Sequence, residues 1–176
     1  MAILAGAWTT IAIAGTNEDL IKAVDRGDMA AVQSLIANGA DANATDRWGS
    51  LTYTDTALMH AAKGGHADVV QALLAAGAAV NAKNEFGETA LMKAAANGDV
   101  EVVRALLAHG ADINVRAKNG NTAILSGSKG GHGDVLLVLM HKFVEINGTS
   151  GNKNMDLILA AGDDQINVVQ QQLDAG

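Results

Sequence analysis

The chain has no cysteine and no proline, and aromatic residues make up only 3% of it. Without cysteine there is no disulfide bond, no thiol nucleophile and no thiolate metal site. The compartment stays open, because a protein without cysteine tolerates either side of a membrane. Hydrophobic residues nevertheless amount to 49% of the chain, so alanine, leucine and valine must build the core.

Positive charge is also scarce. Lys and Arg together number 12 against 19 Asp and Glu, which gives a formal net charge of −7. Nucleic-acid binding draws on clustered Lys and Arg that neutralise phosphates, so we expect no nucleic-acid partner. The acidic balance suits a soluble protein and is compatible with a basic partner.

Residues 1–15 carry no charged side chain and are mostly apolar. The stretch is too short to span a bilayer comfortably as a helix. One interpretation is a secretory signal cleaved after residues 12–14, although the positive segment of such signals is missing and the first cation is Lys22. The other is a helix that covers the apolar flank of the next segment. The chain is therefore cytoplasmic or, if residues 1–14 are a signal peptide, periplasmic or secreted. Membrane association through this segment is a further alternative.

Two phrases recur with one period. The first is Thr-Ala-Leu-Met or a close variant, beginning at Thr56, Thr89 and Thr122, which are 33 residues apart. The second is a run such as Val-Val-Gln-Ala-Leu-Leu, at 69–74, 102–107 and 135–140, again 33 apart. Agreement of two separate phrases on one period indicates an internal repeat.

The same frame extends in both directions. Residues 20–24 and 31–36 match the two phrases at a spacing of 38, which places five extra residues near 50–54. Residues 168–170 lie two periods after 102–104. The chain therefore divides into the apolar segment 1–15 and a repeat domain 16–176, whose units are about 16–45, 46–83, 84–116, 117–149 and 150–176.

Each unit is predicted to form two short helices. The Thr hydroxyl can cap the N-terminus of the first helix. A glycine ends this helix, as at Gly65, Gly98 and Gly131. The second helix repeats apolar residues at i, i+1, i+4 and i+5, which gives one broad apolar face. A polar finger loop then leads to the next unit.

These phrases, the pairs Gly65-His66 and Gly131-His132 and the Gly-Ala-Asp-x-Asn turn together resemble the ankyrin repeat. The resemblance covers nearly everything beyond residue 16. It implies an all-α solenoid of stacked helix–turn–helix units with β-hairpin-like finger loops. One departure is consistent, since alanine follows the capping Thr where the family usually has proline, a residue favoured at the first helical position.

The units are not equivalent. In the fourth unit Gly127-Ser128 replace an Ala pair and Phe143 replaces the turn glycine. In the last unit residues 170–172 are glutamines, and Gln171 and Gln172 stand where the third unit has Ala105 and Leu106, so we expect this unit to be a cap with a solvated outer face.

The resemblance implies that a partner protein binds to the fingertips and the concave face of the first helices. Trp48 and Phe86 occupy the same fingertip position one unit apart, and exposed aromatic residues are common anchors of interfaces. They could also fold back onto the neighbouring fingers. Cations at Arg47, Lys63, Lys83, Lys118 and Lys129 would surround them. The predicted partner-binding residues are Arg47, Trp48, Tyr53, Lys63, Glu85, Phe86, Glu88, Asn97, Lys118, Asn119, Asn121 and Lys129.

Nothing in the sequence predicts catalysis. The five histidines lack zinc-site spacing and occupy structural positions of the repeat or helix ends. The glycine-rich stretch 127–133 falls between two predicted helices, whereas a phosphate-binding loop follows a strand. We therefore predict a non-enzymatic binding module without metal or cofactor, acting as a monomer. A small-molecule or enzymatic site in the concave groove is the alternative.

Overall fold

The structure, a computed structural model, describes residues 16–46 and 54–148. Residues 16–25 are helical. The helices that follow are α2 (Met29–Ala37), α3 (Ala57–Gly64), α4 (Ala67–Ala75), α5 (Ala90–Asn97), α6 (Val100–Ala108), α7 (Ala123–Gly130) and α8 (Gly133–Asn147). The segment 1–15, the residues Arg47, Trp48, Ser50 and Tyr53, and the predicted fifth unit lie outside the described residues.

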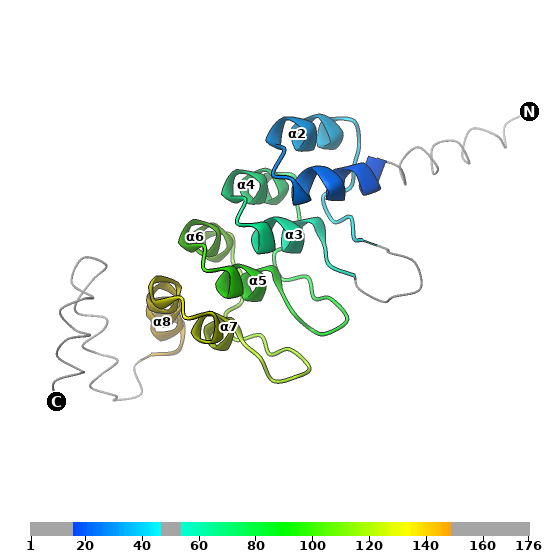
Figure 1. Cartoon of the computed structure of the whole chain (residues 1–176). Coiled ribbons are helices and arrows are strands. Elements are labelled where there is room, and N and C mark those ends of the chain that lie inside the picture. The colour runs from blue at the N-terminus through cyan, green and yellow to red at the C-terminus, as the bar shows by residue number, and fades with distance from the viewer. Residues whose placement is uncertain (1–15, 47–53, 149–176) are drawn as a thin grey trace, which may run out of the picture.

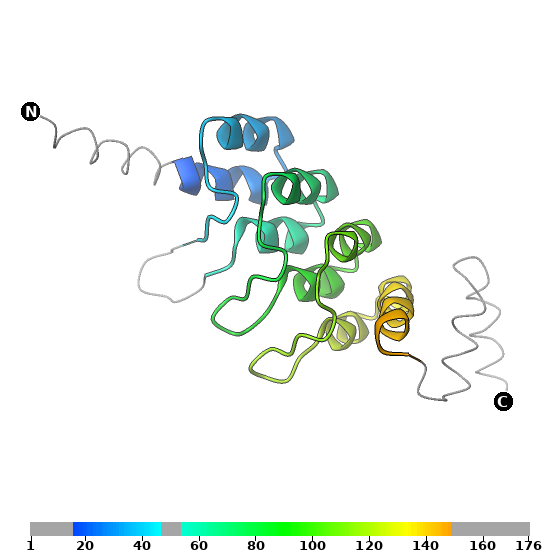
Figure 2. The same cartoon turned by 180° about the vertical axis from the view of Figure 1, so that it is seen from behind.

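The helices form two layers (Figures 1 and 2). The first helices of successive units, α3, α5 and α7, lie side by side in one layer, and α2, α4, α6 and α8 form the other. The loops between units extend from the layer of the first helices. The all-α repeat solenoid is thus confirmed. Within the described residues the loops contain no strand, and Thr45 and Thr56 form a single antiparallel bridge. Among these residues no helix is both long and apolar enough to cross a membrane.

Threonine hydroxyls cap the first helices, as the sequence predicts. Thr56 Oγ1 accepts a hydrogen bond from Met59 N at 3.2 Å, Thr89 Oγ1 from Met92 N at 3.4 Å and Thr122 Oγ1 from Leu125 N at 3.2 Å. Each bond satisfies one of the N–H groups that a helix start leaves without an intrahelical partner. The repeated Thr phrase therefore marks the beginning of each first helix.

Histidine and glycine meet at the turns between the paired helices. His132 Nε2 lies 3.1 Å from the backbone oxygen of Ala96, and His66 Nε2 lies 3.4 Å from that of Asp25, in both cases in the preceding unit. Gly98 has a φ of 86°, and a Cβ at this position would collide with the His132 ring. Only glycine fits there, because it tolerates positive φ and leaves room for the ring. The structural interpretation of His66 and His132 is confirmed.

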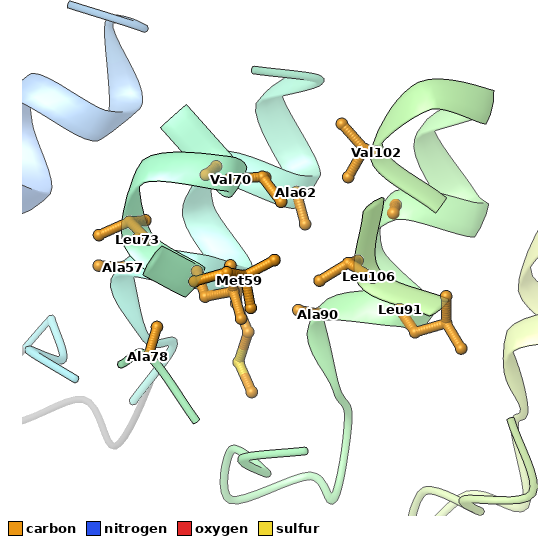
Figure 3. Packing of buried hydrophobic residues seen from close by; sticks show 14 of the residues in the cluster. Ala57, Met59, Ala62, Val70, Leu73, Ala78, Ala90, Leu91, Val102 and Leu106 are labelled. Atoms are coloured by element: carbon orange, nitrogen blue, oxygen red, sulfur yellow. The ribbon is translucent and has the colours of Figure 1, made fainter. Parts of the chain in front are cut away.

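Alanine pairs allow neighbouring units to pack closely. Ala61 and Ala62 of α3 and Ala94 and Ala95 of α5 are completely buried. Figure 3 shows buried residues of two neighbouring units close together: Ala57, Met59, Ala62, Val70 and Leu73 from one, and Ala90, Leu91, Val102 and Leu106 from the next. Small side chains in the first helices bring the helix axes together, while the larger Val and Leu of the second helices fill the remaining space.

A ladder of asparagines joins the turns of successive units. Asn43 and Asn81 each accept a hydrogen bond from a backbone N–H in the turn of the next unit, Ala79 N to Asn43 Oδ1 and Asp112 N to Asn81 Oδ1, both at 2.8 Å. Within the first unit, Asn17 Oδ1 accepts a hydrogen bond from Asp41 N, also at 2.8 Å. Asn81 Nδ2 also donates to the backbone oxygen of Gly110 at 3.0 Å. The ladder satisfies backbone groups that the turns leave unpaired, which fixes the spacing between units.

The fourth unit departs from the pattern where its sequence does. Helix α8 has 15 residues, whereas α4 and α6 have nine each. Phe143 stands where Gly77 and Gly110 end the earlier helices, so α8 continues to Asn147, before Gly148. Leu125 is 44% exposed, although Met59 and Met92 at the equivalent positions are 0% and 3% exposed.

A proline test follows from the first residues of these helices. The backbone N–H of Ala57 donates to the Ala44 oxygen at 2.8 Å, whereas that of Ala90 makes no backbone hydrogen bond in the described part of the chain. Ala90→Pro should therefore raise the free energy of unfolding by roughly 0.4–1 kcal/mol, because proline restricts the unfolded chain and suits this position. Ala57→Pro should lower it by about 1–3 kcal/mol, because the Ala44 oxygen loses its donor. Urea denaturation measures both, and equal effects of the two substitutions would contradict this account.

Candidate protein-binding surface of the fingers

Three loops between units carry most of the predicted contact residues, and Lys63, Asn97 and Lys129 lie on α3, α5 and α7. The three loops are named here the second finger (residues 41–55), the third finger (79–88) and the fourth finger (112–121). In the third finger the buried Asn84 organises the backbone, since its Oδ1 accepts hydrogen bonds from Phe86 N at 3.0 Å and Glu88 N at 2.9 Å. In the fourth finger Asn119 Oδ1 accepts from Asn121 N at 2.9 Å. The fingers are therefore shaped by their own side chains.

A charged network fixes the base of the third finger. Lys93 Nζ of α5 lies 2.6 Å from Glu88 Oε2 and 3.4 Å from Asp55 Oδ2. Asn84 Nδ2 donates to Asp55 Oδ1 at 2.6 Å and to Glu88 Oε2 at 3.1 Å. The four side chains come from the second finger, the third finger and α5, so the network ties two units together.

The network shifts the pKa of both partners of its central pair. Burial acts to raise the pKa of Glu88, but the hydrogen bonds from Lys93 and Asn84 and the charge of Lys93 outweigh it, so the pKa is lowered. For Lys93, burial acts to lower the pKa, but the hydrogen bond to Glu88 and the charges of Asp55 and Glu88 raise it overall. Both shifts favour the charged forms.

Glu85 also makes contacts inside the molecule. Its Oε2 accepts hydrogen bonds from the backbone N of Thr54 at 2.9 Å and from Thr54 Oγ1 at 2.7 Å. The third finger is thereby joined to the end of the second finger. Glu85 and Glu88 were predicted to contact a partner. The structure gives both carboxylates internal roles, and their contact with a partner stays a prediction.

The third and fourth fingers touch through their backbones. Lys118 N donates to the Phe86 oxygen at 2.8 Å. Gly87 has a φ of 75°, and a Cβ there would lie 3.3 Å from Lys118 N and 3.4 Å from Ala117 Cα. A glycine is needed because of this close approach and the positive φ. The contact places Phe86, whose exposed fraction is 43%, next to the tip of the fourth finger.

The fingers and the first helices also carry cations. The side chains of Lys63, Lys83, Arg116 and Lys118 are exposed and make no hydrogen bond or ion pair with any described residue. Lys129 Nζ donates to Asn121 Oδ1 at 3.3 Å, and Asn121 Nδ2 donates to Ser126 Oγ at 2.8 Å. The exposed Asn97 and Asn119 complete the predicted residues that the structure describes.

Sequence reasoning missed three participants: Arg116, Lys93 and Asp55. Arg116 lies 33 residues after Lys83, so the repeat frame contained the signal for a pair of cations on neighbouring fingers. No signal marked Lys93 and Asp55, because their contacts depend on how two units meet.

His60 joins the first unit to the base of the second finger. Its Nδ1 lies 2.7 Å from Asp25 Oδ1 and its Nε2 lies 3.1 Å from Asp46 Oδ2. Each ring nitrogen therefore faces a carboxylate oxygen of a different element. This is a structural clamp, and no group of three or more His, Asp or Glu side chains among the described residues could hold a metal ion.

A family model for ankyrin repeats, in three copies, matches residues 20–117 and, in a second match, residues 68–150. Together the matches cover well over half of the chain. No curated protein matches the sequence significantly.

The Lys93 network predicts an acid-sensitive contribution to stability. Folding lowers the pKa of Glu88. The Glu88 carboxylate therefore makes its full contribution to the free energy of unfolding above the ordinary pKa of 4.5, and this contribution is lost as the pH falls through the lower pKa of the folded state. Glu88→Gln should thus destabilise the protein at neutral pH, and the difference from wild type should shrink towards pH 3. Urea midpoints at the two pH values measure this difference. Glu101→Gln, on the exposed side of α6, is the control, and a difference for Glu88→Gln that does not depend on pH would contradict the prediction.

Proposed function

The chain belongs to the ankyrin repeat family, whose members are generally protein–protein interaction modules, and on this premise we propose that it binds a partner protein through its fingers and the adjoining first-helix face. Of the described residues, the proposed contacts are Phe86, Lys118, Asn119, Lys63, Asn97 and Lys129. Arg47, Trp48 and Tyr53 of the second finger remain part of the proposal. Glu85, Glu88 and Asn121 form hydrogen bonds inside the protein that hold the surface in place, and only their exposed atoms would contact a partner.

The exposed Phe86 on a rigid loop is the observation that carries this proposal. The Phe86 backbone is held on one side by Asn84 and on the other by Lys118. An aromatic side chain on such a loop offers a large contact area, and the backbone has little freedom left to lose on binding. The third and fourth fingers therefore form a preorganised surface.

A non-enzymatic role accords with the family, which is typically without catalytic activity. Among the described residues of the fingers, Asp55 and Glu85 form hydrogen bonds that join two units, and Glu88 forms its hydrogen bonds within the third unit. Their arrangement favours rigidity over proton transfer. We propose a monomer that binds one protein surface and no nucleic acid.

The double variant Trp48→Ala/Phe86→Ala tests the proposal. Partners retained from cell extract by the full wild-type chain are identified, one is purified, and its Kd is measured by calorimetry. The double variant should weaken the Kd by roughly tenfold or more, since buried aromatic anchors carry a large share of interface energy. Ile146→Ala, which removes an exposed apolar side chain near the end of α8, is the matched control. An unchanged Kd for the double variant would show that the fingertips are not the contact surface.

A further inference from the structure

The carboxylates and cations of the third and fourth fingers differ in how the chain uses them. All three carboxylates in these fingers accept hydrogen bonds from the chain itself. Glu85 binds Thr54, Glu88 binds Lys93, and Asp112 Oδ1 accepts from Asn114 N at 2.9 Å at the base of the fourth finger. By contrast, the side chains of Lys83, Arg116 and Lys118 donate to no described residue.

The three cations lie on two fingers that touch, and together with Phe86 they are named here the patch. Lys83 and Arg116 occupy the same position in consecutive units. Lys118 follows Ala117 at the place where the fourth finger meets the third, and its backbone N binds the Phe86 oxygen at 2.8 Å. The patch therefore combines exposed positive charge with an exposed aromatic ring, on loops whose negative groups are already engaged.

We propose that the partner places an acidic segment across the third and fourth fingers, with carboxylates at Lys83, Arg116 and Lys118 and an apolar side chain against Phe86. This inference rests on the proposed binding function of the fingers. It specifies the chemistry of the partner segment.

Desolvation gives the physical reason. An interface that covers Phe86 also removes water from the neighbouring cations. A guanidinium has five N–H donors and an ammonium three, and burying them without acceptors is costly. Carboxylates are the acceptors that match both groups best, and they form charge-assisted, often bidentate bonds with arginine. A neutral or basic segment would leave the cations unpaired.

A protein segment fits this patch better than nucleic acid does. Nucleic acids are bound through long tracks of cations along the phosphate backbone. Here the cations form one short patch on a chain whose formal net charge is −7. A duplex or single strand extending beyond the patch would meet a predominantly acidic protein, whereas a short acidic segment would not.

The first experiment is a titration of the full ¹⁵N-labelled chain with three probes: poly-L-glutamate, poly-L-lysine and a single-stranded thymidine oligonucleotide. Poly-L-glutamate should shift the amide signals of residues 83–88 and 116–121, and the affinity should fall steeply with added salt, because exposed charges are screened. Shifts confined to other residues, no shifts with poly-L-glutamate, or equal binding of poly-L-lysine would overturn the proposal. Comparable binding of the oligonucleotide to the same residues would also overturn it, in favour of a nucleic-acid partner.

Charge reversal gives the second experiment. Arg116→Glu/Lys118→Glu should weaken poly-L-glutamate binding by roughly tenfold or more, since two attractive contacts become repulsive. Arg26→Glu/Arg104→Glu makes the same change in formal charge away from the fingers and should alter binding by less than about twofold. Thermal unfolding of each variant verifies that the fold is intact. Equal losses in the two variants would contradict the assignment to the fingers.

The same variants, measured with the purified natural partner, separate this inference from the proposed function. If Trp48→Ala/Phe86→Ala weakens the Kd but Arg116→Glu/Lys118→Glu and added salt do not, the fingers bind a partner whose segment is not acidic, and the inference fails alone. If neither variant changes the Kd, both proposals fail. If both variants and added salt weaken the Kd, the result supports the proposed function and the inference of an acidic segment.

Discussion

Burial of alanine-rich faces between successive units is the constraint on which the structure depends. A two-helix unit is too small to enclose a core of its own, so its apolar side must be covered by the next unit. Ala61, Ala62, Ala94 and Ala95 are completely buried, and their small size lets the first helices approach closely. The same feature explains why the fold needs so few aromatic residues. The 44% exposure of Leu125 marks where this covering becomes incomplete within the described residues.

Polar contacts add positional precision to this apolar association. Apolar packing alone tolerates sliding of one unit against the next, because it is non-directional. The asparagine ladder, the His60 clamp and the Lys93 network each join groups from different units at fixed distances. Satisfied polar networks of this kind favour a single arrangement over competing ones. The fingers owe their spacing to these contacts, and a surface built across several fingers therefore keeps its shape before a partner arrives.

Features that depend on local sequence or on the repeat period could be predicted, whereas contacts between units could not. The 33-residue period predicted the stacked helices. The roles of the capping threonines and the turn histidines were predicted correctly, because each side chain acts within a few residues or at a fixed position of the repeat. The internal roles of Glu85 and Glu88 were not foreseen. Their partners Thr54 and Lys93 are reached through side-chain conformations at the base of the third finger, and Thr54 belongs to the five-residue insertion that breaks the repeat frame. The greater length of α8 follows from Phe143, because this residue replaces the glycine that ends the equivalent helix in the preceding units.

The net charge of the chain favours a basic partner, whereas the cations of the fingers favour an acidic one. We give the finger cations more weight, because they lie at the proposed contact surface. A formal net charge of −7 favours a basic partner if the distribution of charge over the surface is ignored. Exposed charges act over only about 8 Å at physiological ionic strength, so a partner at the fingers senses few of the distant carboxylates. What it meets is Lys83, Arg116 and Lys118, beside carboxylates that already accept hydrogen bonds from the chain. An extended polyanion would come within this distance of carboxylates elsewhere on the molecule and be repelled, whereas a short acidic segment confined to the fingers would not.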